Sequence, residues 1–181
     1  MGRAMTILIG YATEHGSTRG VAERIGTRLT DAGLDVDVLP LSAVIDLNAY
    51  DAVILGSAIH DGTWLPDAAE YVTRHRTALV RGPLWLFSVG LLGERTSVFP
   101  GWVARSLRQL RSRHESDALV WLRTSVAPIG HRYFTGVIER EHWPVIGRVM
   151  FALMGGRYGD HRDWFGIDAW ADEVVRYLDK A

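Results

Sequence analysis

The stretch that decides the fold is Ile7-Leu8-Ile9-Gly10-Tyr11-Ala12-Thr13-Glu14-His15-Gly16-Ser17-Thr18-Arg19-Gly20-Val21-Ala22. An apolar run ends in a short loop rich in hydroxyl groups, and an amphipathic helical pattern follows at once. This order places hydroxyls and free backbone N–H groups at the N-terminus of a helix, where an anion is stabilised. The loop has no lysine and lacks both the GxxxxGK[ST] and the GxGxxG spacing, which excludes a nucleoside-triphosphate loop and a dinucleotide fingerprint. The stretch therefore predicts a neutral seat for a single phosphate ester.

The composition is that of an ordinary globular domain without thiol chemistry. The chain has 181 residues, of which 48% are hydrophobic and 23% charged, and we expect one domain over residues 1–181. The absence of cysteine excludes disulfides and zinc–thiolate sites, and no other spacing predicts a metal site. A net charge of −1 without a basic stripe argues against a nucleic-acid partner. The opening apolar run is too short for a signal core or a membrane span, so we expect a cytoplasmic protein.

Strand-like and helix-like segments alternate along most of the chain. The predicted strands are 5–11, 34–39, 52–55, 84–89 and 118–127, and the predicted helices are 18–32, 66–80, 101–114 and 167–178. This alternation predicts an α/β fold, a doubly wound five-stranded parallel sheet with helices on both faces. Ligands of such sheets bind beyond the carboxyl ends of the strands.

Three loops leave predicted strand ends with small or polar residues, and we expect them on one rim of the sheet as a cofactor site. The first loop consists of Thr13, Glu14, His15, Gly16, Ser17 and Thr18. The second consists of Ser57, Ala58, Ile59, His60, Asp61 and Gly62. The third consists of Ser88, Val89, Gly90, Leu91, Leu92 and Gly93.

Residues 128–164 break the alternation and are interpreted as an insertion between the last strand and the last helix. They hold a predicted loop at 129–134, an apolar stretch at 143–154 and a glycine-rich turn at 155–160. One side of the apolar stretch carries Trp143, Ile146, Val149, Met150 and Leu153. Such a helix packs against the sheet, pairs with a second copy in a homodimer, or docks on a bilayer surface. It is too short to span a membrane.

The loop after the first strand resembles that of a known family. Thr13-x-x-Gly16-x-Thr18 in this position is similar to the flavodoxin superfamily, in which the loop wraps the phosphate of FMN. The resemblance implies a flavodoxin-like fold and non-covalently bound FMN, with the second and third loops beside the isoalloxazine ring. A phosphate-bearing deazaflavin is the alternative cofactor.

Further fragments resemble one group of that superfamily, the flavodoxin-like protoporphyrinogen dehydrogenases that use a quinone. They are Ser57-Ala58-Ile59, Phe87-Ser88-Val89, and the late apolar stretch ending in Gly155-Gly156 with Asp168-x-Trp170 downstream. This resemblance implies an FMN-dependent oxidoreductase in which the flavin takes a hydride from a porphyrinogen and passes electrons to a quinone. It leaves no side chain as an essential acid or base. A quinone acceptor favours peripheral contact with the inner face of the membrane.

Four more residues are candidate substrate contacts. Trp64 offers a ring to stack on the flavin or a substrate, and packing at a helix N-terminus is the alternative. Arg132, Tyr133 and Arg157 flank the apolar stretch and are suited to substrate carboxylates. The third loop has no aromatic residue, which predicts an open flavin face for hydride transfer. The small net charge disfavours the runner-up, an electron-transfer flavodoxin, and a cofactor-free binding module is the remaining alternative.

Overall fold

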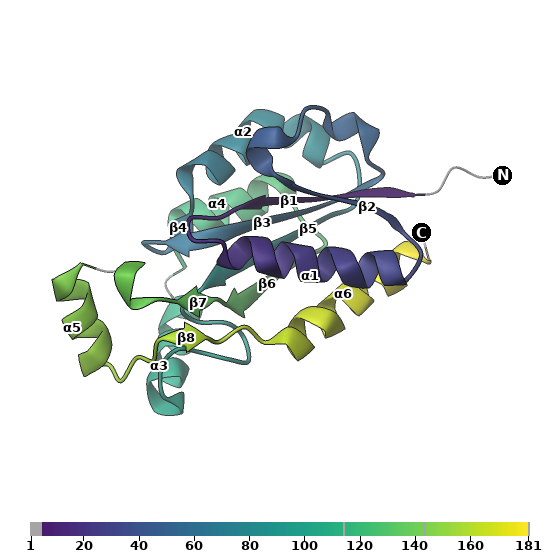
Figure 1. The fold of residues 1–181 in the computed structure, drawn as a ribbon. Coiled ribbons are helices and arrows are strands. Elements are labelled where there is room, and N and C mark those ends of the chain that lie inside the picture. The colour runs from purple at the N-terminus through teal and green to yellow at the C-terminus, as the bar shows by residue number, and fades with distance from the viewer. Residues whose placement is uncertain (1–4, 114, 143, 181) are drawn as a thin grey trace.

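A central parallel sheet lies between two helical layers (Figure 1). The structure is a computed structural model that describes residues 5–113, 115–142 and 144–180. Along the sheet the order is β2 (Asp35–Pro40), β1 (Thr6–Ala12), β3 (Ala52–His60), β5 (Leu84–Gly90) and β6 (Gly130–Thr135), and all neighbours are parallel. The short β4 (Thr63–Trp64) pairs antiparallel with β3. The predicted doubly wound, flavodoxin-like sheet is confirmed.

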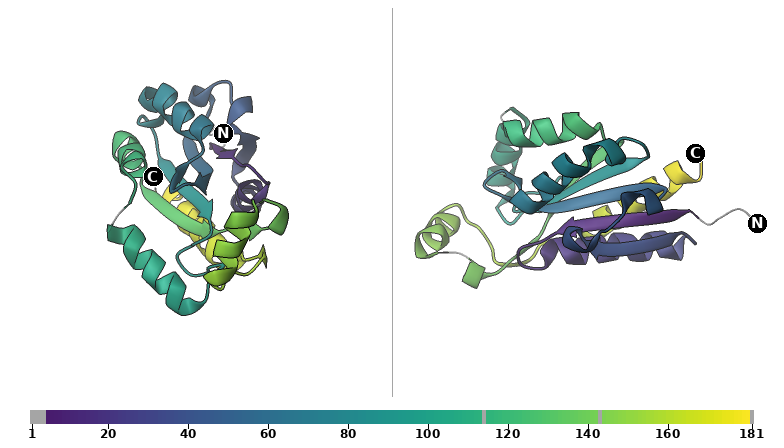
Figure 2. Two further views of the ribbon diagram at one scale, coloured as in Figure 1. Left: turned by 90° about the vertical axis from the view of Figure 1, so that its left-hand side faces the viewer. Right: turned by 90° about the horizontal axis from the view of Figure 1, so that it is seen from above.

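Two hydrophobic cores fill the space between the sheet and its helices. On one face, Ile7 and Ile9 pack with α1 (Ser17–Asp31) and α6 (Trp164–Leu178). On the other, Leu8 packs with α2 (Pro66–Leu79) and α4 (Asp117–Val126). Successive side chains of a strand point to opposite faces, so a strand covered on both sides is apolar throughout. Figure 2 shows the two layers from two further directions.

Residues 118–127, predicted as a strand, form helix α4 instead. Ser116 caps this helix, since its Oγ accepts a hydrogen bond from the backbone N–H of Leu119. Leu119, Leu122 and Val126 are buried at helical spacing and face the second core. The prediction was wrong because β-branched and aromatic residues between these positions imitate the composition of a strand.

The fifth strand, β6, lies in the segment that was predicted as a loop. It is the outermost strand next to β5, and its first four residues are only partly buried. Edge strands tolerate polar side chains, and the sequence Gly130-His-Arg-Tyr-Phe-Thr135 therefore has no strand-like apolar run. The insertion accordingly begins after Thr135 and not at residue 128.

The insertion extends beyond the carboxyl ends of the strands, at the left of Figure 1. It contains β7 (Val137–Ile138), the short 3-10 helix η3 (Arg140–His142), α5 (Val145–Leu153) and β8 (Gly159–Asp160), and β7 pairs antiparallel with β8. Phe151 of α5 packs with Val103 of α3 (Gly101–Arg113) in a third small core. Trp143 lies outside the described residues. Two further 3-10 turns, η1 (Leu41–Ala43) and η2 (Leu47–Ala49), connect β2 to β3.

Candidate functional site

One cavity of about 900 Å³ lies where the three predicted loops meet at the carboxyl rim of the sheet. The first two loops line it with Thr13, Glu14, His15, Ser17, Thr18, Ala58, Ile59, His60, Asp61 and Gly62, and the third with Val89, Gly90, Leu91 and Leu92. The other walls come from α3 and the loop before it, from α4 with its preceding turn, from β6 and from the insertion. They include Phe99, Leu107, Leu110, Arg111, Glu115, Leu119, Tyr133 and Ile138. The structure thus brings the three loops together, as expected from their place after parallel strands.

The first loop closes on itself before α1 begins. The Gly16 N–H donates to Thr13 Oγ1 at 3.0 Å, and Gly16 has a φ of 82° in the left-handed region that favours glycine. Within the described part of the chain no side chain caps the N-terminus of α1, and the first turn of this helix holds no acidic residue. The N–H groups of this turn are therefore available to an anion. Arg19 does not add its charge to the loop, because its guanidinium donates to Glu23 at 2.7 Å, which raises the Arg19 pKa.

Thr18 provides the test of whether a phosphate fits this loop. Its side chain is fully buried and lines the cavity, yet its Oγ1 has no hydrogen-bond partner within the described residues. A buried hydroxyl without a partner costs free energy, and a phosphate oxygen in the cavity would satisfy it. Ser17 lies beside it, and the insertion is anchored here because the Val137 N–H donates to Ser17 Oγ at 2.9 Å. The loop therefore has the donors that a phosphate ester needs.

The second loop is a tight hairpin between β3 and β4. Asp61 and Gly62 have φ values of 48° and 78° and form its two-residue turn, a conformation that Asp-Gly pairs favour. The Gly62 carbonyl accepts a hydrogen bond of 2.8 Å from Ser116 Oγ, so α4 holds the hairpin in place. On the other side, His60 Nδ1 lies 3.2 Å from Glu14 Oε2. The first and second loops are thus connected directly.

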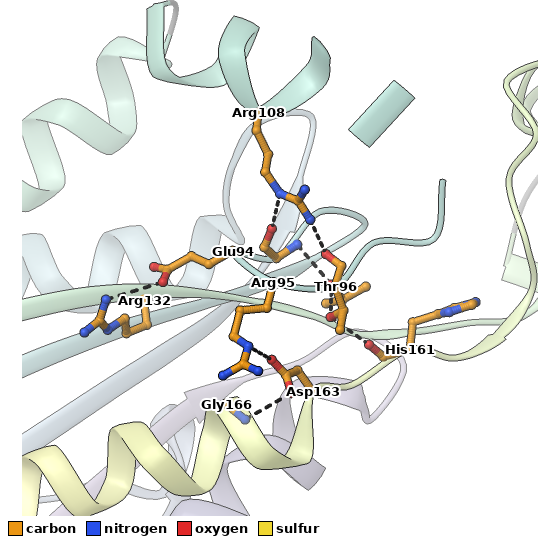
Figure 3. Close-up of polar contacts among 10 residues, drawn as sticks. Glu94, Arg95, Thr96, Arg108, Arg132, His161, Asp163 and Gly166 are labelled. Atoms are coloured by element: carbon orange, nitrogen blue, oxygen red, sulfur yellow. Dashed lines mark hydrogen bonds and ion pairs between the residues drawn. The ribbon is translucent and has the colours of Figure 1, made fainter. Parts of the chain in front are cut away.

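The third loop is fixed by α3 and β6. Arg108 donates to the carbonyls of Gly93 and Thr96, each at 2.9 Å (Figure 3). The Gly93 N–H donates to Thr135 Oγ1 at 3.0 Å, and a Cβ at position 93 would lie 2.6 Å from the Thr135 nitrogen. Gly93 is therefore required for close packing on β6, and it does not line the cavity.

Three predicted site residues are buried and do not line the cavity: Ser57, Trp64 and Ser88. The Trp64 indole N–H donates to Ser88 Oγ at 2.8 Å, and Ser57 Oγ accepts from the Leu65 N–H at 3.1 Å. These hydrogen bonds support the hairpin and the start of α2. Trp64 thus takes the packing alternative, at 2% exposure, and its ring offers no face to a ligand in the cavity.

His131 continues this buried network. Its Nε2 lies 2.8 Å from Ser88 Oγ, and burial lowers its pKa to about 4, so the ring is neutral at neutral pH. Because an indole N–H only donates, Ser88 Oγ accepts from Trp64, and its own hydrogen can be donated to His131 Nε2 when the ring hydrogen is on Nδ1. That Nδ1 is buried without a partner among the described residues. The ring of His131 stacks on Tyr133, with centroids 4.6 Å apart.

The three candidates for substrate carboxylates are placed differently. Tyr133 lines the cavity, and its hydroxyl donates to Glu115 Oε1 at 2.7 Å. Burial, together with this hydrogen bond, raises the Tyr133 pKa. Arg132 does not line the cavity, because it pairs with Glu94 (Figure 3) and with Glu173. Arg157 does not line it either, and its backbone N–H donates to the carbonyl of Val98 at 2.9 Å.

Sequence reasoning missed two charged residues of the cavity, Arg111 and Glu115. Arg111 is near the end of α3, and Glu115 lies in the turn before α4. Both were overlooked because residues 118–127 were assigned to a strand, which hides the turn between two helices. Helical spacing of Leu119, Leu122 and Val126 after Ser116 and Asp117 was the signal that would have revealed this turn.

Comparison with known proteins identifies the family to which this architecture belongs. Residues 8–118 match the flavodoxin domain family, and the chain belongs to this family. It is 29% identical over 188 residues to protoporphyrinogen IX dehydrogenase [quinone] of Escherichia coli strain K12, an alignment that covers 97% of this chain and 98% of the relative. The comparison confirms the resemblance predicted from the sequence and supports the predicted class, a flavin-dependent oxidoreductase.

Solved structures share the fold. The rubredoxin oxygen:oxidoreductase of Desulfovibrio gigas aligns with a TM-score of 0.60 at 16% identity, over 97% of this chain and 36% of that chain. Oxidised flavodoxin 1 of Bacillus cereus aligns with a TM-score of 0.51 at 15% identity, over 94% and 97% of the two chains. Within the residues described, no helix is long and apolar enough to cross a membrane, and no group of His, Asp or Glu is arranged to hold a metal ion.

Proposed function

We propose that the chain is an FMN-dependent oxidoreductase that takes a hydride from a porphyrinogen and delivers electrons to a quinone. The observation that carries this proposal is the lining of the cavity. One end has the unpaired Thr18 hydroxyl and the uncapped start of α1, and the remaining walls are largely apolar. A cavity of about 900 Å³ has room for a cofactor and for part of an organic substrate.

The first loop would hold the phosphate of FMN through neutral donors. A phosphate monoester carries about two negative charges, and a helix N-terminus offers only about half a compensating charge. The hydroxyls of Thr13, Ser17 and Thr18 and the first N–H groups of α1 supply the remaining stabilisation. Residues 58–62 and 89–92 then line the space for the ring. When bound, FMN supplies the acceptance of a hydride and the onward transfer of electrons.

The protein's own contribution is position and exclusion of water. Leu107 and Leu110 of α3 and Leu119 of α4 present apolar surface to the cavity, which keeps a substrate in place while water is excluded. Tyr133 stays protonated at neutral pH, because its pKa is raised and its hydroxyl is committed to Glu115. It therefore holds its proton and does not act as a base. We assign no essential acid or base, since hydride transfer mainly requires correct placement of donor and acceptor.

We further propose that α5 contacts the lipid surface in which quinones dissolve. Its side chains Val145, Ile146, Val149, Met150 and Leu153 are between 54% and 80% exposed. The same segment lines the cavity through Pro144 and Gly147. An exposed apolar helix at the mouth of an apolar cavity suits transfer of a lipid-soluble acceptor from a bilayer. A second copy of the chain is the alternative occupant of this face.

The experiment begins with the absorbance spectrum of the purified protein. We expect an FMN spectrum, or its appearance when FMN is added to colourless protein; a deazaflavin has a different spectrum. The holoprotein should then oxidise protoporphyrinogen in the presence of a menaquinone analogue, whereas an electron-carrier flavodoxin should not. Protein that ignores FMN, or holoprotein no faster than the carrier flavodoxin, would refute the proposal and favour a binding module or a carrier.

A further inference from the structure

Arg111 is a half-buried cation inside the cavity. Its Nη1 donates to the carbonyl of Leu92 at 2.7 Å, and its Cζ lies 4.1 Å from the centroid of the Tyr133 ring. These two contacts hold the guanidinium in one orientation between the third loop and β6. Burial lowers the Arg111 pKa from an ordinary value so high that the group remains charged at neutral pH.

The carboxylates near Arg111 are committed elsewhere. Glu115 lies 2.9 Å from Arg123 and accepts the hydroxyl hydrogen of Tyr133 at 2.7 Å. Glu94 lies 3.4 Å from Arg132. Among the described residues no carboxylate lies within ion-pair distance of Arg111, although it has lost part of its hydration. A buried charge without an opposite charge costs free energy, and the Tyr133 ring offsets only part of that cost.

The surroundings of Arg111 restrict the kind of anion that would fit. Leu92, Leu107 and Leu110 line the same cavity, so a ligand here needs apolar surface as well as charge. Among the described residues that line the cavity, Arg111 is the only arginine or lysine. The phosphate seat lies on a different element, at the start of α1, and relies on hydroxyl and N–H donors. Arg111 is therefore a second, cationic feature of the cavity.

We propose that Arg111 binds a carboxylate of an otherwise apolar ligand and sets the substrate specificity of this site. A guanidinium whose Nη1 is already engaged still presents Nε and Nη2, the fork that pairs with both oxygens of a carboxylate. This inference rests on the proposed function in one respect, since a porphyrinogen with carboxylate side chains is such a ligand. A quinone carries no anionic group, so Arg111 acts on the electron donor and leaves the acceptor unaffected.

Binding of a non-reacting ligand tests this assignment without turnover. The probes are protoporphyrin and its dimethyl ester, titrated into the FMN-loaded protein at one fixed detergent concentration. We expect the wild-type protein to bind the diacid at least tenfold more tightly than the ester. Arg111→Met should weaken binding of the diacid at least tenfold and leave the ester unchanged, and Arg111→Lys should fall between. Arg113→Met, at an exposed position two residues further on α3, is the matched control and should behave as wild type.

Steady-state kinetics and the flavin potential separate the outcomes. In Arg111→Met the KM for the porphyrinogen should rise while the KM for the quinone stays constant. Wild-type protein that binds acid and ester equally, or binds neither, overturns the assignment. So does an Arg111→Met variant that weakens both probes equally, or one that shifts FMN affinity or midpoint potential and keeps the acid preference. If the acid preference holds but no porphyrinogen is oxidised, the proposed function fails and the role of Arg111 stands.

Discussion

Ser88 on β5 and His131 on β6 share a hydrogen bond of 2.8 Å between the serine Oγ and the histidine Nε2, across 43 residues of sequence. Ser88 also accepts the indole hydrogen of Trp64, so this one hydroxyl connects the hairpin of the second loop to the outermost strand. A neutral ring at position 131 places no charge in this buried network, in which its Nδ1 has no partner among the described residues. A protonated ring would replace the acceptor Nε2 with a donor and place a charge in a buried site.

Titration of His131 should therefore make the folded protein less stable as the pH is lowered. Its pKa is about 4 in the folded protein and about 6.5 when unfolded, so between these values only the unfolded chain binds the proton. The free energy of unfolding decreases as pH falls from 6.5 to 4, by about 3 kcal/mol. Urea unfolding at intervals between pH 7.5 and 4 measures this slope. His131→Gln should flatten it, and equal slopes in both proteins would contradict the assignment.

Thr18→Val should weaken FMN binding while the fold is retained. The substitution removes the buried hydroxyl and keeps its shape, so a phosphate loses one donor and the apoprotein loses an unsatisfied group. We expect at least a tenfold rise in the Kd for FMN, measured by flavin fluorescence quenching, with an unchanged or higher urea midpoint. Thr27→Val on the same helix is the control, because the Thr27 hydroxyl bonds to the Glu23 carbonyl. An unchanged Kd in Thr18→Val would mean that the phosphate binds elsewhere.

Gly136→Ala, a substitution in the insertion, should disturb the neighbouring phosphate-binding loop at residues 13–18. A Cβ at position 136 would lie 2.6 Å from Ser17 Oγ and 3.0 Å from Val89 Cγ1, so the start of α1 or the insertion must move. We expect several-fold weaker FMN binding and a loss of about 1–3 kcal/mol in stability, as for other overpacked sites. Gly101→Ala is the control, since a Cβ there meets nothing within 4 Å. If Gly136→Ala behaves like Gly101→Ala, the contact between Gly136 and the start of α1 tolerates a side chain and the prediction is wrong.

Charged substitutions on α5 test the proposed contact with lipid. The double variant Ile146→Asp with Val149→Asp should lose sedimentation with vesicles made from a bacterial polar lipid extract, and its activity with a water-soluble quinone should not change. Ile45→Asp, at a position that is 97% exposed in the N-terminal half, is the control and should still sediment. Wild-type protein that remains in the supernatant but elutes as a dimer, with the double variant monomeric, would instead assign the face to a second copy.

The strands and helices that could be predicted are those whose pattern of apolar residues directly reflects their own burial. β3 and β5 are buried on both faces and appear as continuous apolar runs, and α6 has Ile167, Trp170 and Val174 at helical spacing. β6 could not be recognised, because an edge strand carries polar residues whose partners, such as Glu94, are distant in sequence. α4 was also not recognised, because its strand-like composition was given more weight than the N-cap residue Ser116.

The candidate site divides in the same way. The three loops were predictable because each follows a predicted strand, and parallel strands end at one rim. Arg111 was missed because the wrongly predicted strand at 118–127 hid the turn before α4, and because its place in the cavity depends on contacts with Leu92 and with the Tyr133 ring on β6. From the sequence, Arg132 and Arg157 were equally good candidates for binding substrate carboxylates. The structure shows that neither lines the cavity, since Arg132 forms ion pairs elsewhere and Arg157 lies outside the lining.

Glu94 also covers part of the exposed edge of β6, one of the two outer strands of the sheet. Its backbone N–H donates to the Tyr133 carbonyl at 2.9 Å, and its carboxylate accepts from the Tyr133 N–H at 3.4 Å. Both main-chain groups at the centre of β6 are thereby taken by the protein's own chain. Exposed strand edges otherwise recruit strands from other molecules and start aggregation. The sheet is thus protected against edge-to-edge growth at this point of β6, and β2 is left as the edge at the opposite side of the sheet.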